Sequence, residues 1–492
     1  MARKISLALV LLWILPAFAR EEYTRDFDQT AALPPGHSVR VAHKLGDVVI
    51  RTQTKPEVTV HAVIRVSAGS ASDARRYADD IRIDVRPMGS SLLIETRYPK
   101  QEGGFFGIRN ISYSVNYDIA IPESAPLEVR NSFGAVNISD VKGGADVTNS
   151  HGKLAFRNGR GRQRLENQFA PVEVAGNDGD VTVIDTNGNV DVSDVKGAIE
   201  VRDRFGKVTL SRVGGGAVVN GNGAVQAYSI GDNLRITTSF GPVNARDVKG
   251  NLMVNNTNGT VDADNITGSA ELNTSFAAVR FTGIGGQLSV RANNAPITGR
   301  SIGDAATVQT SYAPVDIGDV RKSIRVISGN GSVALTNVTG EAWVKTSFGL
   351  VKADRVGGPL TVENNNGAVT GYSIKGSANV KTSFAPVTLD GVAGAIDVQN
   401  QNGAVDVTAA RQPTCQPVTV RTSFSALRVH VPSDAGYAVT ARTSFGKINS
   451  ELPMIVTGVV SGNALSGKIG NGACPMQLTN NNGSIEILSL RR

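Results

Sequence analysis

The sequence predicts an all-β protein that folds as a parallel β-solenoid, and three observations lead to this fold class. An aromatic residue recurs about every 36 residues through most of the chain. An Asn-Gly pair, or a variant of it, lies midway between successive aromatics, so the repeating unit is about 18 residues long. The chain also has 54 glycines and only 5% aromatic residues, which favours short strands joined by tight turns. A fixed period of this kind is typical of stacked coils that bury their apolar faces against their neighbours.

We expect the recurring aromatic residues to form a buried structural ladder along the solenoid. Phe384 falls in the corner that Asn366 and Asn402 occupy in the coils before and after, so aromatic and amide corners alternate. Buried rings supply apolar burial that a thin solenoid lacks, and Phe348→Ala is then expected to cost about 3 to 5 kcal/mol. The ladder positions are Phe133, Phe169, Phe205, Phe240, Phe276, Tyr312, Phe348 and Phe384.

Residues 360–377 illustrate one coil. Apolar and polar residues alternate at its start, as in a strand that faces inward at every second position. Asn366 and Gly367 are expected to turn the chain because both residue types tolerate positive φ, and Gly376 makes the second corner. The residues expected to face inward are Leu360, Val362, Val369 and Ile374.

Equivalent strands 18 residues apart run in the same direction, so the predicted sheets are parallel. Crossover chirality favours a right-handed β-helix. A left-handed hexapeptide helix, which has coils of the same length, is the alternative.

Residues 1–19 are predicted to be a secretory signal peptide. Arg3 and Lys4 precede an apolar stretch from Ile5 to Phe18, and a small-residue cleavage pattern ends at Ala19. The apolar stretch is short for a membrane span, and an uncleaved anchor is the alternative. We therefore expect an exported protein, located in the periplasm, on the cell surface or outside the cell, with no transmembrane segment in the mature chain.

Three regions are expected after the signal peptide. Residues 20–130 form a β-rich cap with one short helix from Ser72 to about Ile81, in which Ser72 is the N-cap and the helix covers the first coils. Residues 131–410 form the regular solenoid of 36-residue double repeats. Residues 411–492 form variant C-terminal coils and a cap, because the aromatic spacing stretches to 40 residues and then shrinks to 21.

Two local features have open outcomes. Phe105 and Phe106 lie in a glycine-rich loop that either folds onto its own domain or touches a membrane or a partner. Cys415 and Cys474 are the two cysteines, and export permits a disulfide between them. On regular coils they would lie about three coils, or about 14 Å, apart, which exceeds disulfide reach. A bond therefore requires the C-terminal region to leave the regular stack.

The sequence carries no recognisable catalytic, metal or cofactor motif, so we expect a protein that is not an enzyme and has no cofactor. Asp140, Asp194 and Asp247 recur at corners about three coils apart, too far for an acid–base pair, and are expected to be solvated turn residues. The 50 basic and 43 acidic residues form no basic run, which argues against a nucleic-acid partner. The histidines, which lack metal-ligand spacing, are His37, His43, His61, His151 and His430.

Four features of the sequence occur together: the signal peptide, the strand-like opening Val39–Ile50, the repeated Gly-x-Val-x corners and the ending from Gly467 to Ile487. With these features the chain resembles the bacterial putative adhesin family, a domain-of-unknown-function family of exported β-solenoids. The resemblance spans nearly the whole mature chain. The family implies adhesion or an envelope role and brings no catalytic residues to this chain.

The leading expectation is a non-enzymatic exported β-solenoid that acts as an adhesin-like protein or as a structural or interaction protein of the cell envelope. Its expected partner is an unidentified envelope or surface protein or glycan, and the expected state is a monomer. The alternatives are a polysaccharide-binding or polysaccharide-cleaving β-helix and an envelope-stress accessory protein. Trp343 is the only Trp in the repeat array, and this shortage argues against carbohydrate.

Overall fold

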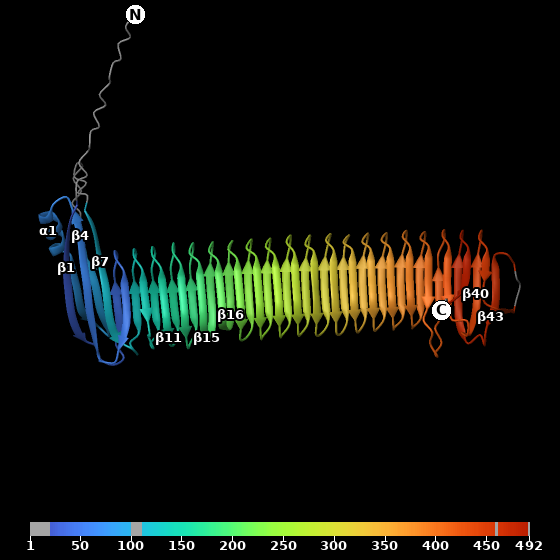
Figure 1. Cartoon of the computed structure of the whole chain (residues 1–492), viewed down its shortest axis with the longest axis horizontal. Coiled ribbons are helices and arrows are strands. Elements are labelled where there is room, and N and C mark those ends of the chain that lie inside the picture. The colour runs from blue at the N-terminus through green and yellow to red at the C-terminus, as the bar shows by residue number, and fades with distance from the viewer. Residues whose placement is uncertain (1–19, 100–110, 458–460, 491–492) are drawn as a thin grey trace, which may run out of the picture. The chain divides into compact units, whose positions relative to one another are not determined.

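The computed structural model describes residues 20–99, 111–457 and 461–490 (Figure 1). Within this part of the chain, every element except the helix α1 (Ala71–Asp80) is a β-strand. The chain divides into two compact units, residues 1–174 and 175–492, which are described separately. The predicted signal peptide and the Phe105-Phe106 loop lie outside the described residues.

The first unit starts with an antiparallel sheet. β1 (Glu21–Ala32) pairs with β4 (Glu57–Ala68), which pairs in turn with β7 (Ser112–Pro122). β5 (Arg82–Met88) and β6 (Ser91–Arg97) also pair antiparallel. Every second residue of β4 is buried, so the sheet has one apolar face to cover.

The short helix expected near Ser72 is present, but it begins earlier than predicted. Ser70 is the N-cap, and its hydroxyl accepts a hydrogen bond from the Asp73 backbone N–H at 3.1 Å. The expectation that the helix covers the first coils is wrong, because α1 packs on β1 and β4 of the antiparallel sheet. Ala74 and Ala78 are its buried residues.

Parallel coils begin inside the first unit. β2 (Ser38–Ala42) pairs in parallel with β6, and β3 (Val48–Gln53) pairs in parallel with β7, so the stack starts on strands of the antiparallel region. The strands that follow in this unit are β8 (Leu127–Arg130), β9 (Val136–Ser139), β10 (Ala145–Thr148), β11 (Leu154–Gly159), β12 (Gln163–Glu166) and β13 (Val172–Asn177), of which the last runs past residue 174.

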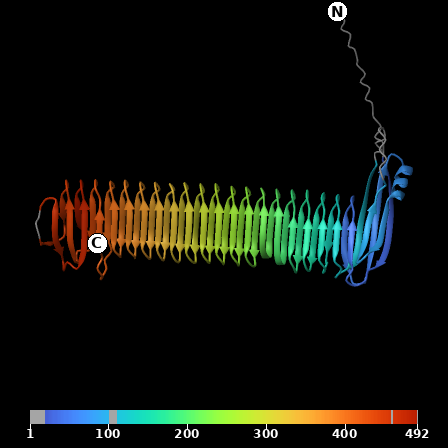
Figure 2. The same ribbon diagram turned by 180° about the vertical axis from the view of Figure 1, so that it is seen from behind.

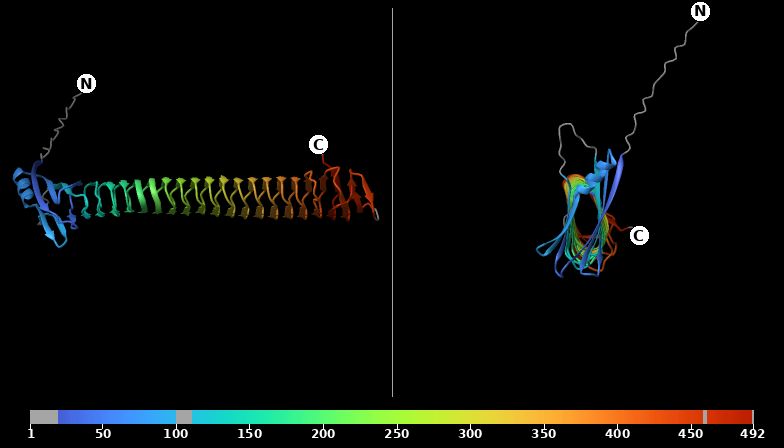
Figure 3. Two further views of the ribbon diagram at one scale, coloured as in Figure 1. Left: turned by 90° about the horizontal axis from the view of Figure 1, so that it is seen from below. Right: turned by 90° about the vertical axis from the view of Figure 1, so that its left-hand side faces the viewer.

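The second unit is a stack of coils, each made of two strands and two turns. One strand of each coil belongs to sheet A and the other to sheet B. In the regular part, residues 18 apart lie opposite each other in parallel strands, as Leu234 does with Leu252 and Val243 with Val261. The rows of parallel strands are visible from both sides, and the view along the stack shows the two sheets facing each other (Figures 1, 2 and 3).

Two long strands, β15 (Val190–Asp203) and β16 (Val208–Asn220), contribute to both sheets. The other strands of sheet A are β14 (Val181–Ile184), β18 (Leu234–Thr238), β20 (Leu252–Asn256), β22 (Ala270–Thr274), β24 (Leu288–Ala292), β26 (Ala306–Thr310), β28 (Ile324–Ser328), β30 (Ala342–Thr346), β32 (Leu360–Asn364), β34 (Ala378–Thr382), β36 (Ile396–Asn400), β38 (Val418–Arg421), β44 (Cys474–Asn480) and β40 (Tyr437–Thr443). Those of sheet B are β17 (Val225–Ile230), β19 (Val243–Val248), β21 (Val261–Ile266), β23 (Val279–Ile284), β25 (Ile297–Ile302), β27 (Val315–Val320), β29 (Val333–Val338), β31 (Val351–Val356), β33 (Val369–Ile374), β35 (Val387–Val392), β37 (Val405–Ala409), β39 (Leu427–Val431), β45 (Ile485–Ser489) and β41 (Ile448–Ser450).

Alternate residues of both strands fill the interior of each coil. Leu360 and Val362 of β32 are buried, as are Val369 and Ile374 of β33, all as predicted. Burying such a side chain is worth about 1.5 to 3 kcal/mol, and the coils repeat this burial along the stack. The predicted fold class, an all-β parallel solenoid with a spacing of about 18 residues, is confirmed.

A β-bulge near the end of the sheet B strands from β15 to β35 keeps the inward residues in phase. Val369 and Gly371 face inward two residues apart, whereas the next inward residue, Ile374, follows three positions later. Ser373 has a φ of 54° and takes no part in the pairing with the next coil. Residues with positive φ at this place in the second unit are Gly176, Asp194, Arg212, Ser229, Asp247, Asn265, Gly283, Ser301, Asp319, Asn337, Arg355, Ser373 and Gly391.

The aspartates predicted to be turn residues occupy bulges instead. Asp140 in the first unit and Asp194 and Asp247 in the second have φ values of 65°, 57° and 57°. Aspartate is one of the few residues besides glycine that adopt this conformation, because its short side chain can bond locally. All three are exposed, and Asp194 and Asp247 lie three coils apart.

The Asn-Gly turns exist, but not for the reason predicted. Neither Asn366 nor Gly367 has positive φ. Glycine is needed because a Cβ at Gly367 would lie 2.0 Å from the Gly349 carbonyl oxygen of the neighbouring coil. Asn364 is buried below this turn, and its Nδ2 donates to the carbonyl oxygens of Gly349 and Gly367 at 2.9 and 2.8 Å. The amide side chain therefore satisfies backbone groups that the tight turn leaves open.

The prediction that the recurring rings are buried is wrong. At each ring turn, the residue that points into the interior is the one two positions before the ring. Thr382, two positions before Phe384, is buried in this way. A hydroxyl or an amide can bond the turn carbonyls there, whereas a phenyl ring cannot, so the ring points outward. Exposed fractions lie between 43% and 66% at the predicted positions Phe133, Phe169, Phe205, Phe240, Phe276, Tyr312, Phe348 and Phe384.

At the C-terminal end the stack no longer follows chain order. β38 pairs with β44, and β39 pairs with β45, so the last strands insert ahead of β40 and β41. β40 stacks on the far side of β44 and also pairs antiparallel with β43 (Ala464–Ile469). β42 (Met454–Val456) pairs with β43 at the outer end.

This change in strand order places Cys415 and Cys474 on neighbouring coils, where they form a disulfide with their Cα atoms 5.3 Å apart. Cys474 is the first residue of β44, and Cys415 lies just before β38. The departure from the regular stack that a bond requires is thus present.

Because the Phe348 ring is 62% exposed, Phe348→Ala should lower the free energy of unfolding by less than about 1 kcal/mol. The matched control is Leu360→Ala, which removes a fully buried side chain and should cost about 2 to 5 kcal/mol. Urea unfolding of both variants checks the prediction. Equal losses in the two variants would contradict the outward placement of the ring.

Asp185 and Asp203 occupy, on neighbouring coils, the buried turn position that Asn364 holds in its coil. The pKa of Asp185 is raised from its ordinary value of 3.8 to about 6, mainly by burial and in smaller part by the charge of Asp203, while backbone N–H groups of the same turn partly offset these effects. A protonated carboxyl can donate to a turn carbonyl as an amide does, and an ionised carboxylate cannot.

We expect Asp185→Asn to stabilise the protein at neutral pH and not at pH 4. The folded-state pKa is raised, so the stability that Asp185 contributes is complete below about pH 4 and is lost as the pH rises through about 6. The gain at pH 7.5 should be about 1 to 3 kcal/mol. Thermal unfolding of both proteins from pH 4 to 8 measures it, and a midpoint difference that does not change with pH contradicts it.

Candidate binding surface

The turns that lead from sheet A into sheet B form one edge of the second unit, here called the aromatic edge. Each turn is the link between two strands, and most of these links have four residues, for example residues 383–386. Neighbouring turns are hydrogen-bonded to each other: the Asn366 N–H donates to the Ser347 carbonyl at 2.8 Å, and the Ser383 N–H to the Asn365 carbonyl at 2.9 Å. The turns of successive coils therefore form a straight, fixed row along the stack (Figure 1).

Ring turns and amide turns alternate along this edge. Successive parallel strands lie about 4.8 Å apart, so rings on every second coil are spaced at about 9.6 Å. The outward rings, which are 50% to 85% exposed, are Phe205, Phe240, Phe276, Tyr312, Phe348, Phe384, Phe424 and Phe445. The residues at the same place in the intervening turns are Asn187, Asn222, Asn258, Asn294, Asn330, Asn366, Asn402 and Asn482.

The aromatic edge carries no charged side chain over most of its length. The twelve turns between Gly221 and Ala426, all within the described residues, contain no Asp, Glu, Lys or Arg. Charged residues make up 19% of the chain, so the 49 residues of these turns would include about nine at average composition. The turns at the opposite edge do carry charges, such as Asp232, Lys249 and Glu341.

The alternation continues where the chain order is broken. Phe424 is followed in space by Asn482, whose N–H donates to the Ser423 carbonyl at 2.7 Å. Asn482 is followed by Phe445, whose N–H donates to the Asn481 carbonyl at 2.8 Å. The order along the edge is thus ring, amide, ring, although Phe445 precedes Asn482 in the sequence by 37 residues.

In the first unit, the two predicted ladder residues belong to a continuous aromatic stack. Phe133 stacks on His151 with ring centroids 4.5 Å apart, and His151 stacks on Phe169 at 4.6 Å. The ring of His151 fills the coil between the two phenylalanines. A search for the 36-residue period alone does not reveal it.

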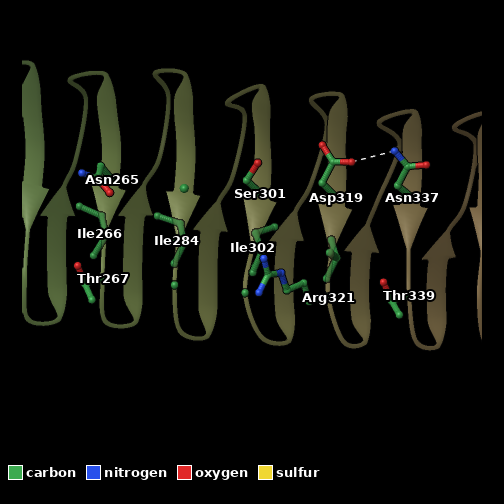
Figure 4. A pocket seen from close by; sticks show the side chains of 14 residues that line it. Asn265, Ile266, Thr267, Ile284, Ser301, Ile302, Asp319, Arg321, Asn337 and Thr339 are labelled. Carbon is green, nitrogen blue, oxygen red and sulfur yellow. Dashed lines mark hydrogen bonds between the residues drawn. The ribbon is translucent and has the colours of Figure 1, made fainter.

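A second feature, here called the bulge groove, crosses the sheet B strands along their bulges. Its central part has a volume of about 660 Å³ and extends from Asn265 to Thr339 (Figure 4). Two further parts of about 560 and 600 Å³ continue it in both directions and share lining residues with the centre. Small residues two positions after the bulge, such as Gly303, leave the groove open above buried residues such as Ile302.

Polar groups along the bulge groove bond to one another. Arg212 holds Asp194 through two hydrogen bonds of 2.6 and 2.7 Å, and this contact lowers the pKa of the Asp194 carboxyl. Asn337 donates to Asp319 at 2.8 Å (Figure 4) and accepts a hydrogen bond from Arg355. The groove therefore has a mixed polar lining in which both signs of charge occur.

The predicted histidines lie apart. His61 contacts Asp28 at 2.8 Å and His430 contacts Asp406 at 3.2 Å, each on its own strand pair. Burial lowers the pKa of His43 to about 4. Among residues 20–99, 111–457 and 461–490, no three or more His, Cys, Asp or Glu side chains are grouped so that they could hold a metal ion. The same residues include no helix long and apolar enough to span a membrane.

Sequence reasoning located the rings but missed the surface that they form. The 36-residue period is the same whether a ring points inward or outward, so it does not reveal the direction. The charge-free turns were visible in the sequence as an additional signal, since Ser-Phe and Asn-Gly turns without charge repeat from Gly221 to Ala426. The proximity of Phe445 and Asn482 could not be predicted from the sequence, because it depends on the order of the strands in the folded chain.

Comparisons with known proteins give the chain no family. No family profile matches it, and no curated protein matches it. One solved structure, described as a putative cell adhesion protein from Clostridium sporogenes, matches with 8% identity and a TM-score of 0.17, covering 95% of this chain and 100% of that one. A match at this TM-score is too weak to assign a fold or a function to the chain. Membership of the putative adhesin family stays a prediction.

Proposed function

We propose that this protein is a non-enzymatic, exported β-solenoid that binds an extended partner in the cell envelope or at the cell surface, in the manner of an adhesin. The observation that carries the proposal is the row of eight outward rings on one edge of the second unit. Single exposed apolar side chains are common, but a regular row of them marks an interaction surface.

The scaffold supports this role because it fixes the rings before a partner arrives. Each turn is hydrogen-bonded to the next, and each coil is held by parallel strands on both sides. Binding to such a surface loses little conformational freedom, and repeated contacts of low individual affinity add up over a long partner.

The non-enzymatic part of the proposal is supported by the composition of the aromatic edge. The twelve charge-free turns also contain no His or Cys. General acid–base and most nucleophilic mechanisms need such groups within hydrogen-bond reach of the substrate. The edge offers rings, amides and hydroxyls, which bind but do not transfer protons readily at neutral pH.

Export can be tested with a C-terminally tagged full chain in a bacterial host. We expect the protein in the periplasm or the medium, with a mature N-terminus at Arg20 found by mass spectrometry. A variant with Leu11→Arg and Leu12→Arg, which breaks the apolar stretch, should stay in the cytoplasm. Full-length protein retained in the cytoplasm of the unmodified strain contradicts the proposal.

Binding and the lack of catalysis can be tested with the purified exported protein. It should sediment with cell-envelope preparations or extracellular matrix material, and the length distribution of isolated polysaccharides should not change after prolonged incubation. Absence of binding to all of these materials contradicts the binding role. Shortened polysaccharide chains contradict the non-enzymatic role.

A further inference from the structure

The aromatic edge has three properties that together limit what it can bind. It has no charge over twelve turns, so it has no electrostatic attraction for nucleic acids or other polyanions. Its rings stand on one straight line. Their spacing of two coils, about 9.6 Å, is constant.

A straight ligand with a matching repeat fits this row best. In an extended β-1,4-linked polysaccharide, successive pyranose rings alternate in orientation, so every second sugar turns the same face to a flat surface. The repeat is one disaccharide, and its length is nearly that of two coils of the solenoid. Chains of α-1,4-linked sugars wind into helices and do not keep this register with a straight row.

The chemistry of the two turn types also suits such a chain. The C–H groups on a pyranose face pack on an aromatic ring, and Phe348 and Phe384 present rings that are 62% and 61% exposed. Asn366, on the coil between them, can donate to and accept from the hydroxyl groups of the intervening sugar. Rings and amides thus alternate with the same period as the sugar orientations.

The changed strand order at the C-terminal end indicates that the spacing of the rings itself matters. A simple duplication of a 36-residue repeat explains alternation within residues 205–402, but not beyond them. Phe424, Asn482 and Phe445 continue the alternation in space although their order in the chain is different. The alternation of rings and amides is therefore kept along the surface even where the order of the turns in the chain changes.

We propose that the aromatic edge binds an extended, neutral β-1,4-linked polysaccharide, with one ring for each disaccharide. The proposal rests on the binding role proposed above and names the ligand class of that surface. The disaccharide repeat is slightly longer than two coils, so this match holds over a few consecutive rings and drifts along the full row of eight. Each ring adds a weak contact, and the row supplies affinity through their number.

The experiment measures depletion of the purified full-length protein by microcrystalline cellulose and by chitin, with granular α-1,4-glucan as the control polymer. The first variant replaces all eight outward rings with Asn, the residue that the alternate turns carry. We expect binding to cellulose or chitin, little binding to the α-linked polymer, and affinity more than about 100-fold lower in the variant. Tyr372→Ala, which removes a partly exposed ring on sheet B away from the edge, should leave binding unchanged.

A second variant tests the spacing without changing the composition. Phe348→Asn combined with Asn366→Phe moves one ring by one coil, and both positions precede a glycine, so the two turns are matched. Loss of one register contact should weaken binding about 2- to 10-fold. Circular dichroism and the melting midpoint of each variant report whether the solenoid is intact.

The outcomes separate this inference from the broader proposal. Binding to envelope or matrix material that persists in the eight-ring variant overturns the inference and leaves the binding role standing, through another face of the protein. Equal binding to β- and α-linked polymers, or no binding to either β-1,4-linked polymer, also overturns it. Failure to bind any envelope or matrix material, together with failure to bind either β-1,4-linked polymer, overturns both.

Discussion

The hydrogen bonds of buried polar residues below the turns are the interaction on which the second unit depends. Asn364 bonds the carbonyl oxygens of its own turn and of the preceding coil, and Thr382, at the equivalent position of the next coil, donates to the Asn365 carbonyl oxygen of the preceding turn at 3.4 Å. These bonds satisfy backbone groups that a narrow interior closes off from water. They also occupy the inward corner, which leaves the outward corner to residues such as Phe384 and Asn366.

Much of the fold follows from sequence periodicity. The inward positions of Leu360, Val362, Val369 and Ile374 could be predicted because alternation in a strand has only two phases. The bulge at Ser373 could not, since serine gives no signal for positive φ. The outward direction of Phe348 was missed for an energetic reason: burial of a ring is favourable in general, but here it competes with the hydrogen bonds of a buried threonine.

Only part of the candidate surface could be predicted from the sequence. The ring positions and the Asn-Gly turns could be read directly, and so could the absence of charge between Gly221 and Ala426. The juxtaposition of Phe424, Asn482 and Phe445 depends on strand order, which involves contacts between residues far apart in the chain. The bond between Cys415 and Cys474 depends on the same reordering, and for that reason the sequence left it open.

The inserted C-terminal strands have a consequence for how the end of the stack resists fraying. A solenoid whose last coil is also last in the chain can unravel from its terminus one coil at a time. Here the outermost strands belong to residues 437–469, the middle of a loop whose two ends are tied by Cys415–Cys474. β45 lies between β39 and β41, so its release breaks pairings on both of its sides and does not remove a free outer strand.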